Sequence, residues 1–254
     1  MQMLVNLFQK SCRKKMFKIL IPARLNSQRL QKKLLEKVDY KTIIQLTWEA
    51  CMKTNAEEVI VVTDSDEIFE LINNLGGKAY RSGKEHNSGT DRIQEYVEEM
   101  KLSDDELIVN VQGDEPMIEV EAINKLGSFM AENQFKYGTL AKDFDNDDHL
   151  IDTNKVKVLV DGNKGLDFFR TSPNYSHDSY KILHHIGVYA FTVGFLNLFA
   201  KMPPTANEEK LNLEQLRALD NGLPINVLEL ELKNSWGIDT KEDLKKLREF
   251  FKSN

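Results

Sequence analysis

Residues 106–114 read ELIVNVQGD, a short apolar run that ends in Gly113 and Asp114. The run does not alternate between apolar and polar residues, which is typical of a strand buried on both faces. Two similar runs occur earlier in the chain, FKILIP at 17–22 and EVIVVT at 58–63. Helical patterns lie between these runs, so the sequence predicts alternating strands and helices and a parallel sheet that is covered on both sides.

The pattern changes after Phe144. Residues 155–161 alternate between polar and apolar, residues 165–170 can pair with them, and residues 185–191 form another expected strand. An antiparallel or mixed section is therefore predicted here. The other predicted elements are helices at about 42–53, 66–74, 90–100, 205–220 and 240–252 and strands at 78–80 and 225–232.

These patterns predict a single domain. We expect one α/β domain over residues 16–254 with an inserted β-rich section at about 150–205, because no Pro- or Gly-rich linker divides the chain. Residues 1–15 are expected to be a dispensable, disordered extension, or else a short amphipathic helix that touches a membrane. No stretch approaches the roughly 18 consecutive apolar residues of a spanning helix, so no membrane span is predicted.

Composition excludes several functional classes. The chain has 34 Lys and Arg against 40 Asp and Glu, a net charge of −6, so it lacks the basic surplus of a broad nucleic-acid binder. Its two cysteines, Cys12 and Cys51, cannot form a disulfide framework, which fits a reducing cytoplasm. No G-x-G-x-x-G follows a strand, and the Gly-Lys pairs at 77–78 and 83–84 lack the Ser or Thr of a P-loop, which disfavours dinucleotide oxidoreductases and P-loop ATPases.

Four cations, Arg24, Arg29, Lys32 and Lys33, follow the first predicted strand within one loop. Ligands of open α/β sheets bind beyond the carboxyl ends of the strands. In an acidic protein, cations at that position are well suited to bind an anion such as a triphosphate. A solvated basic loop is the alternative, and the loop alone does not decide between the two.

Two carboxylates are candidates for a metal site. Asp114 follows a buried strand directly, and Mg²⁺ is usually bound by one or two carboxylates together with phosphate oxygens and water. An ordinary turn is the alternative, because Gly113 lets the backbone turn and Pro116 ends the strand. Asp239 is the second candidate, although an Asp just before a helix also commonly caps it.

Six motifs occur along the chain in a fixed order: IPARLNSQRLQKK at 21–33, HNSGTDR at 86–92, VNVQGDEPM at 109–117, HHIGVYAF at 184–191, LEQLRAL at 213–219 and GIDTKEDL at 237–244. From about Phe17 onward the chain resembles the 3-deoxy-manno-octulosonate (Kdo) cytidylyltransferases, or CMP-Kdo synthetases. The resemblance implies a Rossmann-like nucleotidyltransferase fold of the glycosyltransferase-A type, with a mostly parallel sheet and a β-rich section that pairs two subunits into a homodimer. It also implies Mg²⁺-dependent transfer of the cytidylyl group of CTP to Kdo, a 2-keto sugar acid, for lipopolysaccharide synthesis.

The resemblance further implies roles for single residues. The catalytic residues would be Asp114 and Asp239, which would hold Mg²⁺, and Arg24 and Lys33, which would neutralise the departing pyrophosphate. The CTP site would be lined by Ala23, Arg24, Lys33, Ser88, Gly89 and Gln112. The sugar acid would be faced by Arg29, His185, Tyr189, Glu214 and Gln215. The anomeric hydroxyl would attack the α-phosphorus, so no protein nucleophile is needed.

Three stretches depart from the family pattern. Residues 29–35 read RLQKKLL instead of RLPGKPL, residues 168–173 read FFRTSP where the family has an aromatic-Ser-Arg segment, and His184 replaces a frequent Arg. Because the second stretch would border the sugar, 8-amino-Kdo or a nine-carbon sialic-type acid stay open as alternatives to Kdo. A non-catalytic nucleotide-binding relative is a distant alternative, disfavoured because Asp114 and Asp239 are both present.

Overall fold

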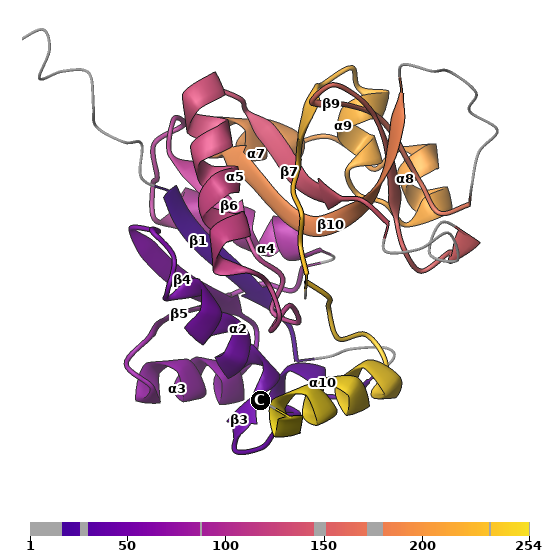
Figure 1. The fold of residues 1–254 in the computed structure, drawn as a ribbon. Coiled ribbons are helices and arrows are strands. Elements are labelled where there is room, and N and C mark those ends of the chain that lie inside the picture. Colours follow the sequence, from indigo (N-terminus) through magenta and orange to yellow (C-terminus); the bar gives the residue numbers. More distant parts are fainter. Residues whose placement is uncertain are drawn as a thin grey trace, which may run out of the picture.

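A single mixed sheet organises the fold (Figure 1). The structure is a computed structural model, and it describes residues 17–25, 30–86, 88–144, 151–171, 180–233 and 235–253. Within these residues nine strands join in the order β5-β4-β1-β6-β10-β7-β11-β9-β8. The strands are β1 (Phe17–Ala23), β4 (Glu58–Thr63), β5 (Lys78–Arg81), β6 (Leu107–Asn110), β7 (Tyr137–Lys142), β8 (Lys157–Asp161), β9 (Lys164–Phe169), β10 (Lys181–Thr192) and β11 (Ile225–Glu229), and a separate hairpin consists of β2 (Lys37–Val38) and β3 (Lys41–Thr42).

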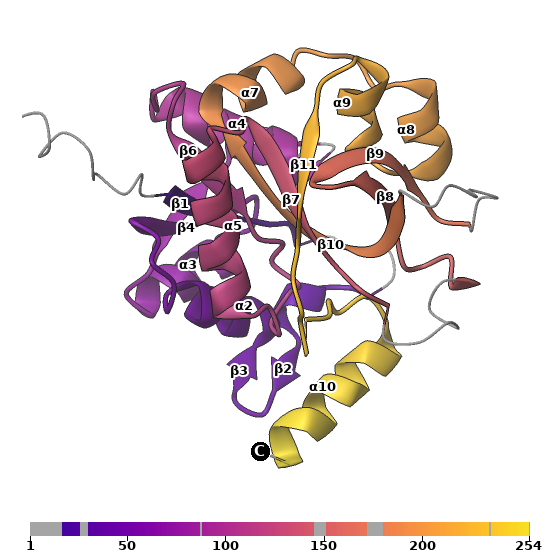
Figure 2. The same cartoon turned by 45° about the horizontal axis from the view of Figure 1, so that its top comes forward.

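Helices cover both faces of this sheet. They are the short 3₁₀ helix η1 (Lys33–Leu35) and α2 (Ile43–Cys51), α3 (Asp66–Asn74), α4 (Gly89–Glu99), α5 (Val120–Asn133), α7 (Val193–Phe199), α8 (Ala206–Leu211), α9 (Leu216–Asp220) and α10 (Lys241–Ser253). One core cluster joins α2, α3, α5 and α10 to one face of the sheet, and a second joins α4 and α7 to the other. The C-terminal helix α10 lies beside the β2–β3 hairpin (Figure 2).

The parallel half of the sheet agrees with the sequence. Strand β1 pairs in parallel with β4 and with β6, and β4 pairs in parallel with β5. The central residues Ile19, Val61 and Val109 are fully buried, as expected for strands without alternation. Parallel pairing brings the carboxyl ends of these strands to one edge of the sheet, and the loops that follow them are therefore neighbours.

The other half of the sheet is antiparallel or mixed and closes on itself. Strand β10 pairs with β6, β7 and β8, β8 also pairs with β9, β9 with β11, and β11 with β7. Strands β10, β7, β11, β9 and β8 thus form a closed ring, while β10 also continues the parallel half. The sheet is therefore mixed rather than mostly parallel, and the β-rich residues continue it without a break.

The helix predicted at 205–220 is wrong, because the structure divides it in two. Helix α8 begins with a capping box in which the Thr205 hydroxyl accepts from the Glu208 N–H and the Glu208 carboxylate accepts from the Thr205 N–H. It ends at Leu211, and the residue that caps it, Asn212, has a left-handed φ of 52°. Residues 213–215 form a turn before α9, so Glu214 and Gln215 lie on a turn and not on a helix.

The two remaining expectations about the chain concern membranes and the N-terminus. No helix in the described ranges has the length and apolar character needed to cross a bilayer. The extension at residues 1–15 lies outside the described residues.

His185 on β10 is a buried histidine with a defined partner. Its side chain is mostly inaccessible, and Nε2 lies 2.9 Å from the hydroxyl oxygen of Thr139. That hydroxyl is 2.8 Å from the carbonyl oxygen of Val188, to which it donates its single proton, so Nε2–H of His185 donates to Thr139. Burial, and secondarily the neighbouring His184, lower the pKa of His185 to about 3.

We predict that His185 makes the fold acid-sensitive. In the unfolded chain its pKa is near the ordinary 6.5, so between pH 6.5 and about 3 the unfolded state binds the extra proton. The stability due to neutral His185 is complete above pH 6.5 and falls toward pH 3 by up to about 1.4 kcal/mol per pH unit. His185→Gln keeps a nitrogen donor for Thr139 but does not titrate. In urea unfolding from about pH 7.5 to 4.5, its free energy of unfolding should therefore fall less steeply than that of the wild type. Equal slopes would contradict the prediction.

Candidate functional site

A cavity of about 790 Å³ opens beyond the carboxyl ends of β1 and β6, between the start of α4 and the segment from α8 to α9. Its lining includes six of the residues predicted from the sequence: Ala23, Arg24, Ser88, Gly89, Gln112 and Glu214. Lys33, Asp114, Asp239, His185, Tyr189 and Gln215 do not belong to this lining. Arg29 lies outside the described residues. The cavity thus collects residues expected to bind nucleotide together with one expected to face the sugar.

The start of α4 forms one wall of this cavity. Ser88 caps the helix, and its hydroxyl accepts a hydrogen bond of 3.1 Å from the N–H of Asp91. A Cβ on Gly89 would lie 3.1 Å from Cγ of Pro22, so glycine lets the first turn of α4 pack against the end of β1. The first N–H groups of a helix lack partners within it and favour anions. The close packing therefore brings an anion-binding feature to the edge of the cavity.

Lys33 joins the two carboxylates that the sequence suggested for a metal. Its ammonium group contacts the carboxylate of Asp114 and lies 3.2 Å from Oδ1 of Asp239. The backbone supports this arrangement, because the N–H of Ile238 donates to the carbonyl of Asp114 over 2.9 Å. Two carboxylates from distant parts of the chain therefore share one cation.

Glu115 is a third acidic side chain beside this carboxylate pair. Burial, followed by the charges of Asp114 and Asp239, raises the pKa of Glu115 to about 8 although Lys33 opposes the shift. Within the described ranges no three His, Cys, Asp or Glu side chains are arranged to hold a metal ion. Mg²⁺ needs fewer protein ligands, because phosphate oxygens and water complete its coordination. Asp114 and Asp239 supply oxygen donors and already share one cation, the ammonium of Lys33, so the pair suits a Mg²⁺ ion.

Arg92 and Asp64 hold the loop after β1, and sequence reasoning did not find them. The buried guanidinium of Arg92 donates to the carbonyl of Ala23 over 2.9 Å and to Oδ2 of Asp64 over 2.7 Å. Oδ1 of Asp64 accepts from the N–H of Leu25 over 3.2 Å. Asp64 follows the buried strand β4 directly, the same signal that singled out Asp114, so it could have been found. These contacts fix the backbone on both sides of Arg24.

Glu214 joins the segment from α8 to α9 to the start of α4. Its Oε2 accepts a hydrogen bond of 2.6 Å from the hydroxyl of Thr90, and the nearby Ser88 hydroxyl also favours the ionised carboxylate. Burial raises the pKa of Glu214 despite these donors. The residue expected to face the sugar therefore contacts the helix turn expected to bind nucleotide.

His185 and Gln215 are buried, and both lie against the half-buried Tyr189 next to this contact. The hydroxyl of Tyr189 donates to Oε1 of Gln215 over 3.2 Å, and the rings of His185 and Tyr189 lie 5.4 Å apart. Phe168 lies edge-on against His185 with ring centres 5.1 Å apart. The sequence stretch that departs from the family pattern thus begins in contact with the residues expected to face the sugar.

Comparison with known proteins identifies the family. A family model described as cytidylyltransferase matches residues 18–230. The chain belongs to the cytidylyltransferase family. The 3-deoxy-manno-octulosonate cytidylyltransferase 2 of Actinobacillus pleuropneumoniae serotype 5b is 39% identical over 245 residues, which cover 91% of this chain and 97% of that protein. The 3-deoxy-manno-octulosonate cytidylyltransferase of Photobacterium profundum is 36% identical over 91% of this chain and 98% of its own length.

Solved structures agree with this assignment to the cytidylyltransferases. The structure of a CMP:2-keto-3-deoxy-manno-octonic acid synthetase complexed with CTP has a TM-score of 0.86 and 30% identity, and the match covers 94% of this chain and 99% of that one. A cytidylyltransferase from Leptospira borgpetersenii has a TM-score of 0.62 at 18% identity, which supports the fold alone. The family resemblance indicated by the six motifs and the nucleotidyltransferase fold are confirmed.

We predict that Arg92→Lys loosens the loop after β1. Lysine keeps the charge but cannot reach the Ala23 carbonyl and Asp64 with one planar fork. The variant should lose roughly 2 kcal/mol of stability and exchange the amide hydrogen of Leu25 faster, as measured by urea unfolding and hydrogen–deuterium exchange.

Arg248→Lys is the matched control. Arg248 also donates to a backbone carbonyl, that of Lys37, and to a carboxylate, that of Glu36, but it is half-exposed and lies on α10. Its substitution should change stability by about 1 kcal/mol or less and leave Leu25 unaffected. Similar exchange at Leu25 in both variants would refute the role of Arg92.

Proposed function

We propose that this protein transfers the cytidylyl group of CTP to the anomeric hydroxyl of Kdo, releasing pyrophosphate and giving CMP-Kdo for lipopolysaccharide synthesis. The observation that carries the proposal is the match over nearly the whole chain to a CMP-Kdo synthetase complexed with CTP. The cavity supports it, because Ala23, Arg24, Ser88 and Gly89 all line it. The names of the curated relatives support Kdo as the acceptor.

The nucleotide would bind between the loop after β1 and the start of α4. Backbone N–H groups at Ser88 and Gly89 can donate to phosphate oxygens, and the exposed Arg24 can neutralise their charge. Lys33 would assist the departing pyrophosphate. The protein needs mainly to align two anions and to stabilise charge in the transition state, which oriented N–H groups and cations do well.

Asp114 and Asp239 would hold Mg²⁺ in this proposal. Their convergence on the ammonium of Lys33 supports it, because the same oxygens can bind a divalent cation. When bound, Mg²⁺ orients the triphosphate and lowers the pKa of an attacking hydroxyl. The requirement for the metal ion is part of the proposal.

The acceptor would be bound by Arg29, His185, Tyr189, Glu214 and Gln215. Glu214 lines the cavity, which supports this assignment, and Gln215, which follows it in the chain, accepts from the hydroxyl of Tyr189. Arg170, in the stretch that departs from the family pattern, donates to the carbonyls of Leu211 and Asn212. It therefore holds the turn that carries Glu214. Because this stretch differs from the family pattern, 8-amino-Kdo and a sialic-type acid stay alternative acceptors.

We also propose that two copies pair through the β-rich section at about 150–205 and that the enzyme works in the cytoplasm. The family resemblance supports the pairing, and so do the exposed apolar side chains of Ile151 and Tyr180 in this section. Analytical ultracentrifugation should give twice the chain mass at micromolar concentration. A monomer at all accessible concentrations would rule the dimer out.

Turnover with defined substrates tests the proposed reaction. Pyrophosphate release should require CTP, Mg²⁺ and Kdo, and UTP should be far poorer because a site built for the cytosine amine leaves its acceptors unpaired against uracil. Equal use of UTP would contradict the base assignment. Better use of 8-amino-Kdo, or use of a nine-carbon acid alone, would change the acceptor but keep the cytidylyl transfer.

Asp114→Asn tests the carboxylate pair. Removing a charge that acts on the reacting centre should lower kcat about 100-fold or more while CTP affinity changes little. Glu70→Gln, at an exposed position of α3 outside the cavity and the proposed interface, is the control and should behave as the wild type. A loss confined to the KM for CTP would contradict a role of Asp114 at the reacting centre.

A further inference from the structure

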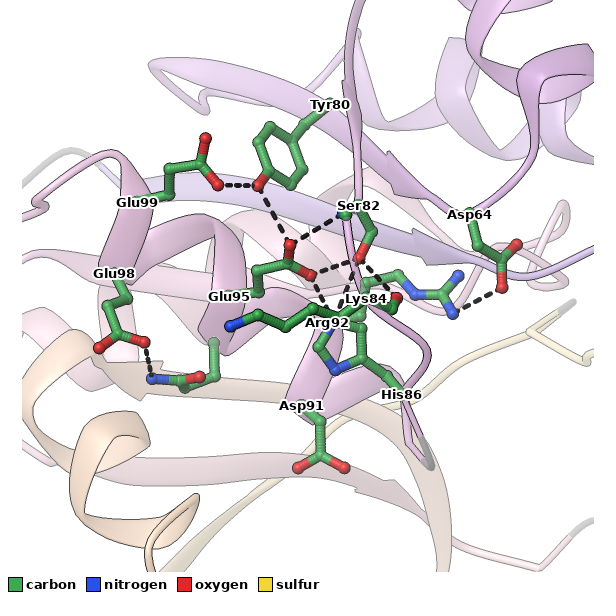
Figure 3. A network of polar contacts seen from close by, with 12 residues as sticks. Asp64, Tyr80, Ser82, Lys84, His86, Asp91, Arg92, Glu95, Glu98 and Glu99 are labelled. Atoms are coloured by element: carbon green, nitrogen blue, oxygen red, sulfur yellow. Dashed lines mark hydrogen bonds and ion pairs between the residues drawn. The ribbon is translucent and has the colours of Figure 1, made fainter.

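A buried carboxylate on α4, Glu95, holds the loop that follows β5 (Figure 3). Its oxygens contact the hydroxyl of Ser82 and Nε2 of His86 and accept from the N–H of Gly83 over 2.9 Å. The hydroxyl of Tyr80 lies 3.4 Å away on the other side. Three residues of one short loop, 82–86, are thereby anchored to a single residue that is 8% exposed.

Glu95 is an anion in the folded protein. Burial alone would favour the neutral acid, but hydrogen bonds from Ser82, His86 and Gly83 outweigh it and lower the pKa of Glu95 to about 2. An ionised carboxylate only accepts hydrogen bonds. Nε2 of His86 therefore carries a proton, and the contact is a directed hydrogen bond rather than a chance approach.

The anchored loop leads into the cavity. His86 lines it, and Ser88 and Gly89 follow two and three residues later. Strand β5 is an edge strand of the described sheet and pairs there only with β4, so the sheet supports the loop from one side. The position of this wall therefore depends on the contacts with Glu95.

We propose that Glu95 is a positioning residue for the nucleotide and that His86, which it holds, is part of the wall against which the nucleotide binds. Neither Glu95 nor His86 is among the residues assigned above as catalytic or substrate-binding. The assignment rests on the proposed function, since it names the nucleotide as the ligand of this wall. The acceptor sugar is expected by Glu214, which lies on the turn between α8 and α9 and not on the loop that Glu95 holds, so loss of Glu95 should affect the two substrates unequally.

The test compares Glu95→Gln and His86→Ala with the wild type. Glu95→Gln replaces one accepting oxygen by an amide NH₂, which cannot accept from Ser82, Gly83 or His86. His86→Ala removes the contact between His86 and Glu95. Both should raise the KM for CTP about tenfold, the equivalent of one or two lost hydrogen bonds, with kcat and the KM for the sugar acid within about twofold. CTP binding measured by calorimetry without acceptor should weaken by the same factor.

Two further variants make the test specific. His86→Gln retains a nitrogen donor at the position of Nε2 and should recover most of the lost CTP affinity. Glu98→Gln, one turn along the same helix, removes an exposed carboxylate that contacts Gln94 and should match the wild type. If Glu95→Gln unfolds at lower temperature than the assay allows, the His86 variants decide the question.

The outcomes separate the two proposals. A wild-type protein that neither binds CTP nor releases pyrophosphate contradicts the proposed function. A wild-type protein that does both, with Glu95→Gln and His86→Ala unchanged in the KM for CTP, overturns the positioning role. Equal losses for both substrates, or a loss in kcat alone, also overturn it, because a merely structural defect would act in that way.

Discussion

The parallel pairing of β1 with β4 and β6 determines where functional side chains can meet. Because the three strands run in the same direction, their carboxyl ends place Ala23, Asp64 and Gln112 along one edge of the sheet. Helices cover both faces of this half, so a ligand has access only at the edge. The cavity, the carboxylates at Asp114 and Asp239 and the loop after β1 all depend on that pairing.

Helix α4 connects this edge to three other segments. Thr90 contacts Glu214, Arg92 contacts the loop after β1, and Glu95 contacts the loop after β5. At about 100° per residue, Arg92 and Glu95 leave the helix about 60° apart, and Thr90 leaves it from roughly the opposite side. One short helix can therefore fix three parts of the cavity wall, and its own position depends on the close packing of Gly89 on Pro22.

The sequence was sufficient for elements whose signals are local. Strand β4 and helix α3 have the predicted bounds, because an apolar run without alternation is followed by the capping residue Ser65. The division between α8 and α9 was missed because it depends on a left-handed residue that is Asn212, with no Gly or Pro to mark it. For the site, the rule about strand ends found Asp114, whereas Arg92 and Glu95 lie on a helix, where charged side chains normally face solvent.

The charges at the site explain why a divalent cation belongs to the proposed reaction. Arg92 is paired with Asp64, Arg217 with Glu208, and Lys33 with Asp114 and Asp239. These cations are already largely neutralised by neighbouring carboxylates, in a chain with a net charge of −6. A triphosphate would add several negative charges beside Asp114 and Asp239. Arg24 and the start of α4 can offset part of that charge, and the proposed Mg²⁺, bound together with the substrate, would offset more of it.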